Sequence, residues 1–383
     1  MNNVFIAEMG SYLPNAPVGN DDMEQVLGMV GERPSRARRI TLRNNGIRLR
    51  HYAIDPASGK PTHTNAQLSA NAVRRGLERA GWRLSDTDVL ACGTSSPDQL
   101  KPGHAAMVHG ELGASRLEAV SMAGVCCAGM AALKYAYLTV KSGDAKRAIA
   151  TGSELASSFM AARNFPGESP GATEAASEHP NLAFEKDFLR WMLSDGAGAA
   201  LLCAEPNSKR SSLRIDWIDG MSLAGELPVC MYSGAIKTEN GGLRGWREAQ
   251  SPEDMLREHY FAVKQDARLL DLHIPRLAGA DTIGAVLAKR GLLAADVDWF
   301  LPHYSSQYFR PILARTLEAA GAAIPEQRWF TNLESVGNAG SASIYLMLDD
   351  LLQSGRLKRG ERILCFVPES ARFSVYYMLL TVV

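Results

Sequence analysis

One stretch of the sequence decides the fold: Ser121-Met122-Ala123-Gly124-Val125-Cys126-Cys127-Ala128-Gly129-Met130. It starts at the end of a short apolar run, passes through a glycine-containing turn and enters an alanine-rich segment that extends to about Lys141. A strand that leads through a tight turn into a helix is the basic unit of layered α/β folds. At such a junction the free N–H groups and the positive end of the helix dipole favour a thiolate. The stretch therefore predicts an α/β fold with a nucleophilic cysteine at a strand-to-helix turn.

The two adjacent cysteines are not equivalent in this prediction. We expect Cys127 to be the nucleophile, because the small residues Ala128 and Gly129 would let a substrate approach the backbone. Cys126 is expected to point elsewhere and to pack. The alternative interpretation is that both are small packing residues at the turn. The other four cysteines lie in short apolar runs, and without a Cys-x-x-Cys pair the chain predicts reduced thiols and no metal site.

The same alternation of strand and helix patterns extends along the whole chain. In the first half, apolar runs predict strands at residues 4–9, 89–93, 118–122, 147–152 and 197–204, and helical periodicity predicts helices at 21–30, 65–80, 104–112 and 128–141. The second half predicts strands at 213–218, 298–302, 362–367 and 374–383, a long helical region at 252–292 that is broken near Pro275, and helices at about 305–320 and 339–353. Two such halves suggest a duplicated layered domain.

The predicted division gives residues 1–208, which contain the cysteine junction, and residues 209–383. The boundary is expected near residues 205–212, where Pro, Asn, Ser, Lys and Arg interrupt the pattern. Residues 166–180 are rich in Gly, Pro, Ser, Glu and Ala, and an irregular stretch of this length is typical of a lid or a binding loop.

The composition excludes several classes of protein. Among 383 residues, 41 Lys and Arg balance 41 Asp and Glu, so there is no general positive field for a nucleic acid. The longest apolar runs are shorter than the roughly 20 residues of a membrane span. The first residues lack the basic and apolar regions of a signal peptide, so we expect a cytoplasmic protein.

Residues 33–50 are a local exception to this balance. They contain seven arginines and no acidic residue, which suits a phosphate-bearing partner. The alternative interpretation is a solvated helix face whose arginines pair with acids elsewhere in the chain.

Two further strand-to-helix junctions contain polar side chains. His303 follows an apolar run at its carboxyl end, and Asn338 lies in a glycine-flanked turn before a helix. In α/β sheets, side chains at the carboxyl ends of strands line the crevice where ligands bind. Each has a structural alternative, as a helix-capping imidazole or as a capping and turn-forming amide. Together with the cysteine, they predict a site built from three equivalent junctions.

In these motifs the sequence resembles the thiolase-fold condensing enzymes, most closely the β-ketoacyl-acyl-carrier-protein synthase III group. The similarity spans nearly the whole chain. The matching pieces are Cys127-Ala128-Gly129, Ser194-Asp195-Gly196-Ala197-Gly198-Ala199, Pro302-His303, Gly337-Asn338, and Asn45-Gly46-Ile47-Arg48 with Arg50-His51.

The resemblance implies a duplicated α-β-α-β-α layered fold with pseudo-twofold symmetry, usually found as a homodimer. It implies an acyltransferase in which Cys127 is acylated and His303 and Asn338 assist the condensation. The backbone N–H of Cys127 and one from the C-terminal loop would form an oxyanion hole. No metal or redox cofactor is implied, and the expected partners are acyl carrier protein, acyl-coenzyme A, or both.

The sequence departs from the family pattern at the substrate entrance. Ile40 and Asn44 stand where the initiating members have a Trp and an Arg that hold the adenine of coenzyme A. Basic side chains nearby could instead meet a phosphopantetheine arm or an acidic carrier protein; they are Arg36, Arg38, Arg39 and Arg43. Lys101 replaces an aromatic residue at the far end of the acyl pocket.

The C-terminal loop also departs from the family pattern. Pro368-Glu369-Ser370-Ala371-Arg372 replaces the usual glycine-rich loop, so that Glu369 and Ser370 are expected near the site. Glu369 is a candidate additional base, and the alternative is a surface salt bridge with Arg372.

The resemblance leads to one functional hypothesis and three alternatives. The hypothesis is a Claisen-type condensation of acyl thioesters. Residues 34–39 and 62–66 are similar to the subgroup that makes dialkylresorcinols, which joins a β-ketoacyl thioester to an α,β-unsaturated acyl thioester and closes a cyclohexanedione ring. The alternatives are acyl transfer from cysteine to an oxygen or nitrogen nucleophile, a non-catalytic partner subunit, and a binding module that uses the basic segment.

Overall fold

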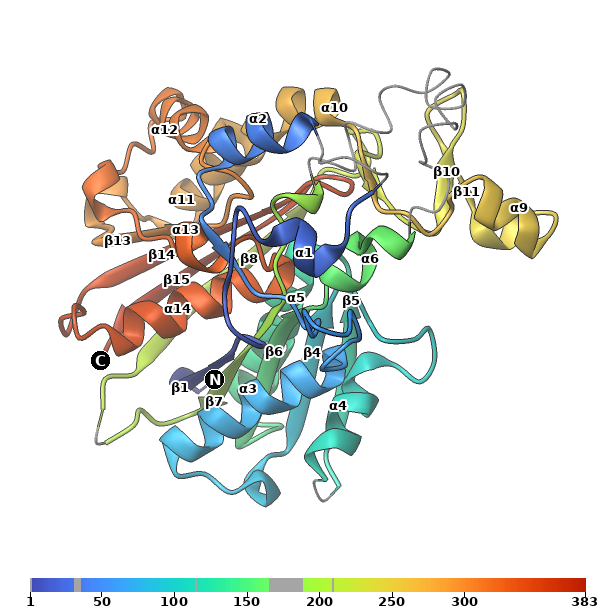
Figure 1. Ribbon diagram of the computed structural model, residues 1–383. Coiled ribbons are helices and arrows are strands. Elements are labelled where there is room, and N and C mark those ends of the chain that lie inside the picture. Colours follow the sequence, from blue (N-terminus) through green and yellow to red (C-terminus); the bar gives the residue numbers. More distant parts are fainter. Residues whose placement is uncertain (1, 31–35, 114–115, 165–188, 209) are drawn as a thin grey trace.

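The structure is a computed structural model that describes residues 2–30, 36–113, 116–164, 189–208 and 210–383 (Figure 1). The irregular segment predicted at residues 166–180 lies outside the described residues. None of the described helices is long and apolar enough to cross a membrane.

A nine-stranded mixed sheet organises the chain. Its spatial order is β13-β14-β15-β8-β1-β7-β6-β4-β5. The strands are β1 (Phe5–Tyr12), β4 (Val89–Thr94), β5 (Glu118–Ala123), β6 (Arg147–Glu154), β7 (Gly196–Cys203), β8 (Leu213–Ser222), β13 (Trp299–Pro302), β14 (Arg362–Glu369) and β15 (Ser374–Val382). Short two-stranded pairs lie outside it: β2 (Val18–Gly19) with β3 (Leu49–Arg50), β9 (Met231–Tyr232) with β12 (Lys264–Gln265), and β10 (Ala235–Lys237) with β11 (Leu243–Gly245).

The strand order repeats on the two sides of the contact between β1 and β8. Outward from that contact, β1, β7, β6 and β4 are joined by antiparallel, antiparallel and parallel pairings. In the other half, β8, β15, β14 and β13 are joined by the same three pairings in the same order. A parallel bridge from Phe300 to Trp329 takes the place that β5 has in the first half. This topology is the duplication that the sequence predicted, and the division at residues 208 and 209, between β7 and β8, stays a prediction.

Alternation along the strands sorts the core into layers. In β7, Leu201 packs in a core cluster with α3 (Asn65–Ala80), whereas Ala200 and Leu202 pack in a second cluster with α5 (Cys126–Ser142) and α14 (Ser343–Gln353). In β14, Cys365 belongs to that second cluster, and Phe366 faces a third cluster with α12 (Phe309–Ala319). Successive side chains of a strand point to opposite faces of the sheet. The second cluster contains residues from strands of both halves together with α5 and α14, so these two helices lie between the halves of the sheet and the layers run α-β-α-β-α. The predicted layered fold is confirmed.

The helices α5 and α14 form the middle layer and lie against each other. The hydroxyl of Tyr345 on α14 donates to the carbonyl of Gly129 on α5 at 2.8 Å. Because this layer is shared by both halves, the N-terminus of α5 lies where residues from both halves can reach it.

Two outer helices begin and end where the sequence predicted. The helix α3 begins after Thr64, whose hydroxyl accepts from Gln67 N in a capping box, and α4 spans His104–Leu112. The remaining helices are α1 (Met23–Leu27), α2 (Arg36–Asn45), α6 (Ser157–Met160), α9 (Pro252–Arg257), α10 (Ala267–His273), α11 (Ala285–Arg290) and α13 (Leu333–Val336).

The helical region predicted at residues 252–292 is wrong in part. It contains α9, then β12, and then α10, a 3₁₀ turn, a π-helical turn and α11. His259 adopts a positive φ of 52°, which ends the first helical segment, and Asp266 starts α10 by accepting from Arg268 N and Leu269 N. Figure 1 shows β10, β11 and α9 extending from the body of the molecule on the right.

Candidate active site

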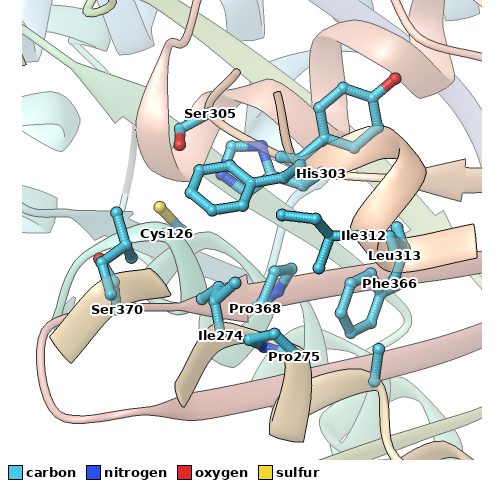
Figure 2. Close-up of a pocket in the computed structure, with 14 residues that line it drawn as sticks. Cys126, Ile274, Pro275, His303, Ser305, Ile312, Leu313, Phe366, Pro368 and Ser370 are labelled. Carbon is cyan, nitrogen blue, oxygen red and sulfur yellow. The ribbon is translucent and has the colours of Figure 1, made fainter. Parts of the chain in front are cut away.

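Two cavities meet at the N-terminus of α5. The larger has a volume of about 290 Å³ and the smaller about 60 Å³. Three residues line both cavities: Cys126, Ser305 and Ser370. Figure 2 shows the Cys126 side chain at the smaller cavity, with His303, Ser305 and Ser370 around the same space.

The structure places Cys126, and not Cys127, at the cavities. Cys127 is 5% exposed, lines neither cavity, and its Sγ donates to the carbonyl of Val367 at 3.3 Å. Successive residues of a helix differ in direction by about 100°, so only one of two adjacent side chains at its start can face the cavities. The expectation that Cys126 points away from the site is therefore corrected, whereas the assignment of the nucleophile to Cys127 stays a prediction.

The environment of Cys126 favours the neutral thiol. Burial raises the pKa of Cys126 well above its usual value, and the nearby carboxylates of Glu369 and Glu154 raise this pKa further. The carboxylates near this helix terminus therefore oppose the stabilisation of a thiolate that the sequence analysis expects there.

His303 lies directly after β13, and its backbone N–H donates to Phe366 O at 2.8 Å. The side chain is 4% exposed and lines the smaller cavity. Burial lowers the pKa of His303 to about 4, so the imidazole is neutral at neutral pH. Neither ring nitrogen is hydrogen-bonded within the described residues, which leaves one donor and one acceptor for a ligand.

Asn338 lies in the turn between α13 and α14 and lines the larger cavity. Its backbone N–H donates to Met192 O at 3.0 Å, and its carbonyl accepts from Ser194 N at 2.9 Å. The side-chain Oδ1 accepts from Gly340 N at 3.0 Å, which fixes the orientation of the amide. In the part of the chain that the structure describes, the Nδ2 group has no hydrogen-bond acceptor, so it can donate to a ligand.

The three predicted junctions therefore converge around two cavities that share Cys126. Cys126 comes from the first half of the chain, and His303 and Asn338 come from the second. Among the described residues, no group of three or more His, Cys, Asp or Glu side chains could hold a metal ion.

Glu154 is a site residue that the sequence analysis missed. It is the last residue of β6 and lines the larger cavity. Its Oε2 accepts from the hydroxyls of Ser95 at 2.6 Å and Ser96 at 2.7 Å. Its Oε1 accepts from Ser341 N at 3.2 Å. Burial raises the pKa of Glu154. A charged residue directly after the buried residues of a strand was the sequence signal for it.

Two residues of the C-terminal loop, Ser370 and Glu369, have different surroundings. Ser370 lines both cavities, and its Oγ accepts from Gln265 Nε2 at 2.8 Å. Glu369 lines neither cavity; its Oε2 instead accepts from Val125 N at 2.9 Å and Cys127 N at 3.1 Å. The Cys127 N–H that was expected in an oxyanion hole is thus bonded to Glu369. No ion pair between Glu369 and Arg372 occurs among the described residues.

The predicted cationic binding residues differ in their surroundings. Lys101 is exposed and lines neither cavity, and its place at the end of an acyl pocket stays a prediction. Arg38 is ion-paired with Glu24 at 2.6 Å and Asp21 at 3.4 Å, as in the alternative interpretation of this segment. Arg43 is exposed on α2. The side chains of Arg36 and Arg39 lie outside the described part of the chain.

Sequence comparisons find similar proteins over nearly the whole chain. Residues 287–367 match the model of the 3-oxoacyl-[acyl-carrier-protein] synthase III C-terminal domain. The chain is 28% identical to β-ketoacyl-[acyl-carrier-protein] synthase III of Neisseria meningitidis serogroup C over 364 residues, which cover 94% of this chain and 93% of that protein. It is 27% identical to the synthase III of Neisseria gonorrhoeae, with the same coverage.

Solved structures show the same fold. OleA from Xanthomonas campestris superposes with a TM-score of 0.76 at 20% identity, covering 99% of this chain and 98% of OleA. The tetronic acid condensing enzyme AbyA1 gives 0.74 at 22% identity, with 99% of both chains covered. 3-Oxoacyl-(acyl carrier protein) synthase III from Pseudomonas aeruginosa gives 0.69 at 21% identity, covering 100% of this chain and 98% of that one. The chain therefore has a thiolase-type fold, is similar over nearly its whole length to β-ketoacyl-[acyl-carrier-protein] synthases III, and is an enzyme of the condensing acyltransferase type.

Proposed function

We propose that this enzyme condenses two acyl thioesters through an acyl intermediate on Cys126. The observation that supports this most directly is that Cys126 lines both cavities, whereas none of the other five cysteines lines either. A nucleophile between two cavities can receive an acyl group from one side and present it to a second substrate from the other.

In the first half-reaction, Cys126 Sγ attacks the carbonyl carbon of an acyl thioester. An S–C bond forms to Cys126, the thioester C–S bond breaks, and the thiol of the carrier leaves. The imidazole of His303 can take up the thiol proton and pass it to the leaving thiolate, because it is neutral at neutral pH and neither ring nitrogen has a hydrogen-bond partner in the described structure.

In the second half-reaction, the α-carbon of another acyl thioester loses CO₂ or a proton and attacks the carbonyl carbon on Cys126. A C–C bond forms, the S–C bond to Cys126 breaks, and the Cys126 sulfur takes a proton, which comes from the α-carbon of the second substrate or, when CO₂ is lost instead, from solvent. The negative charge that develops on the thioester oxygen of the second substrate needs hydrogen-bond donors. The Nδ2 group of Asn338 and the ring N–H of His303 are donors without another partner in the described structure.

For the substrates, we propose the pair used in dialkylresorcinol synthesis, a β-ketoacyl and an α,β-unsaturated acyl thioester that together give a cyclohexanedione. The lining of the smaller cavity supports an apolar chain on that side. Its side chains include Leu270, Ile274, Phe309, Ile312 and Leu313. The larger cavity would hold the other acyl group.

Acyl carrier protein, acyl-coenzyme A, or both are the proposed donors. We also propose a homodimer. The exposed Arg43 on α2 is the described cation that we assign to the phosphate of the carrier arm. The end of α2 contacts the loop that lines the site, since Gln307 N donates to Asn45 O at 2.9 Å.

Intact-protein mass spectrometry after incubation with panels of acyl-carrier and acyl-coenzyme A thioesters tests the proposal. We expect an acyl adduct on the wild-type protein and on Cys127→Ala, and none on Cys126→Ala. An adduct that survives Cys126→Ala and disappears in Cys127→Ala would return the nucleophile to Cys127. Analysis of released products then separates a C–C bond from an ester or an amide, which would indicate transfer to oxygen or nitrogen.

A further inference from the structure

Glu369 contacts the helix that begins with Cys126 although it lines neither cavity. Its Oε2 accepts from the backbone N–H groups of Val125 at 2.9 Å and Cys127 at 3.1 Å, the residues on either side of Cys126. Val125 has φ −113° and ψ −122°, outside the usual helical and strand regions, so the turn into α5 is sharp. A single carboxylate oxygen therefore holds both sides of the nucleophile.

The negative charge of this carboxylate lies close to Cys126. No described residue provides a positive partner for it, because Glu369 takes part in no ion pair and its Oε1 makes no hydrogen bond within the described chain. A carboxylate beside a thiol opposes ionisation of the thiol, and it also occupies N–H groups that would otherwise stabilise a thiolate.

Other titratable groups surround Cys126 on each side. Glu154 comes from β6, His303 follows β13, Tyr376 comes from β15, and Cys127 follows on α5 itself. None of these is a cation at neutral pH, since burial lowers the pKa of His303 to about 4. Burial raises the pKa of Glu369, and the two backbone N–H donors act in the opposite direction and favour its charged form. These N–H groups, and no cationic side chain among the groups named, partner the carboxylate beside Cys126.

We propose that Glu369 is a positioning residue that holds the start of α5 and keeps Cys126 as a neutral thiol until an acyl thioester enters. This inference rests on the proposed acyl transfer at Cys126. An acyl-enzyme carries no charge on sulfur, so the carboxylate opposes the free thiolate and not the product of acylation. A thiol held neutral reacts slowly with alkylating agents and oxidants, and the nucleophile is protected between turnovers.

Alkylation of Cys126 by iodoacetamide as a function of pH tests this role without any acyl substrate. Peptide mass spectrometry with fragmentation distinguishes Cys126 from Cys127. In Glu369→Gln, the amide oxygen still accepts both N–H groups but carries no charge. We expect the midpoint pH of alkylation to fall by about one unit or more, which is about tenfold in rate at a pH below the midpoint.

Two further variants complete the experiment. Glu369→Asp keeps the charge, and its midpoint is expected to stay near that of the wild type. Glu253→Gln removes an exposed carboxylate on α9, and its curve should coincide with the wild-type curve. A folded Glu369→Gln protein with the wild-type midpoint overturns the proposal.

The two proposals fail in different ways. If acyl transfer at Cys126 is wrong, the wild type shows no acyl adduct or its adduct survives Cys126→Ala, and the alkylation curves are unaffected. If the role of Glu369 is wrong, the adduct forms, and the alkylation midpoint does not move in Glu369→Gln.

Discussion

Glu154 and Glu369 occupy equivalent places in the two halves of the sheet. Each is the last residue of an eight-residue strand that begins with arginine, β6 for Glu154 and β14 for Glu369. Each strand pairs antiparallel with the next strand in the chain, and in both pairs the glutamate faces the first residue of that strand, Gly196 or Ser374. The duplication is thus visible at a single residue position.

The two carboxylates also make equivalent contacts across the middle layer. Glu154, from the first half, accepts from the backbone N–H of Ser341 before α14, and Glu369, from the second half, accepts from Val125 and Cys127 at α5. Each half therefore binds the beginning of the central helix of the other half. The difference between the two helix starts is that only the one at α5 has a cysteine at the cavities.

The contact between the two central helices predicts a large effect of one methyl group. A Cβ added at Gly129 would lie 2.4 Å from Ser341 O, a backbone atom that cannot move aside easily. We expect Gly129→Ala to lower the free energy of unfolding by about 2 kcal/mol and to slow acylation of Cys126. Urea denaturation and intact-mass acylation rates measure the two effects.

Gly110→Ala is the matched control for this substitution. Gly110 lies within α4, and a Cβ there would meet no atom within 4 Å. The added methyl group should leave stability unchanged or raise it by up to about 1 kcal/mol, because alanine favours the helix over glycine. Equal free energies of unfolding for Gly129→Ala and Gly110→Ala would contradict the prediction, because the added methyl group at Gly129 would then be accommodated at no cost in stability.

The buried imidazole of His303 predicts a specific loss of stability in acid. Its pKa in the folded protein is lowered to about 4, below its ordinary value of 6.5, so the unfolded chain binds more protons between these values. Its contribution is therefore present above about pH 6.5 and is lost as the pH falls toward 4. By the usual conversion of about 1.4 kcal/mol for each pKa unit, the loss is about 3 kcal/mol.

His303→Gln isolates this effect, because glutamine does not titrate while the other buried groups, such as His104 and Asp195, are common to both proteins. Urea denaturation from pH 8 to pH 4 measures the free energy of unfolding of both proteins. As the pH falls, the wild type should lose more of its unfolding free energy than the variant. A difference that stays constant over this range contradicts a buried neutral imidazole.

The sequence predicted much of the fold and part of the site, for identifiable reasons. Strand and helix periodicity is strong where a segment has one buried face, and α3 and α4 begin and end as predicted. The pattern failed in the region of residues 252–292, where short elements are stabilised by tertiary pairing such as β12 with β9. Local periodicity contains no information on such pairing.

The sequence predicted the junction at which the cavities meet, but not that Cys126 lines them. Which of Cys126 and Cys127 faces the cavities depends on the rotation of α5 at its first residue, which is set by the turn at Val125 and the contact with Glu369. Neither is visible in a strand-turn-helix pattern. His303 and Asn338 were easier to predict, because each is the single polar side chain with this chemistry at its junction.

The basic segment predicts two different outcomes at two arginines. Arg43 is exposed, so Arg43→Glu should weaken binding of a phosphopantetheinylated carrier protein about tenfold, and more at low than at high salt. Arg38 is ion-paired with the buried carboxylate of Glu24, so Arg38→Gln should lower stability by about 1–3 kcal/mol and change carrier binding little. Surface plasmon resonance at two salt concentrations and thermal unfolding compare the variants. If both variants are folded and Arg38→Gln binds the carrier protein more weakly than Arg43→Glu, the assignment of the carrier contact to Arg43 is wrong.

Asn338 predicts a separation of the two half-reactions. Its Oδ1 is held by Gly340 N, so the Nδ2 group is oriented and has no other acceptor in the described residues, as a donor to a developing oxyanion requires. In Asn338→Ala, condensation should fall about 100-fold or more, whereas acylation of Cys126, which does not use this donor, should fall less than about tenfold.

Single-turnover mixing with a labelled acyl thioester, followed by acid quench, measures acyl-enzyme by intact mass and condensed product by chromatography. Accumulation of the acyl-enzyme in the variant is the signature of the assigned role. A parallel loss of both signals would instead mean that the Asn338 turn supports the site through Met192 and Ser194, to which its backbone is bonded, and takes no part in stabilising the second substrate.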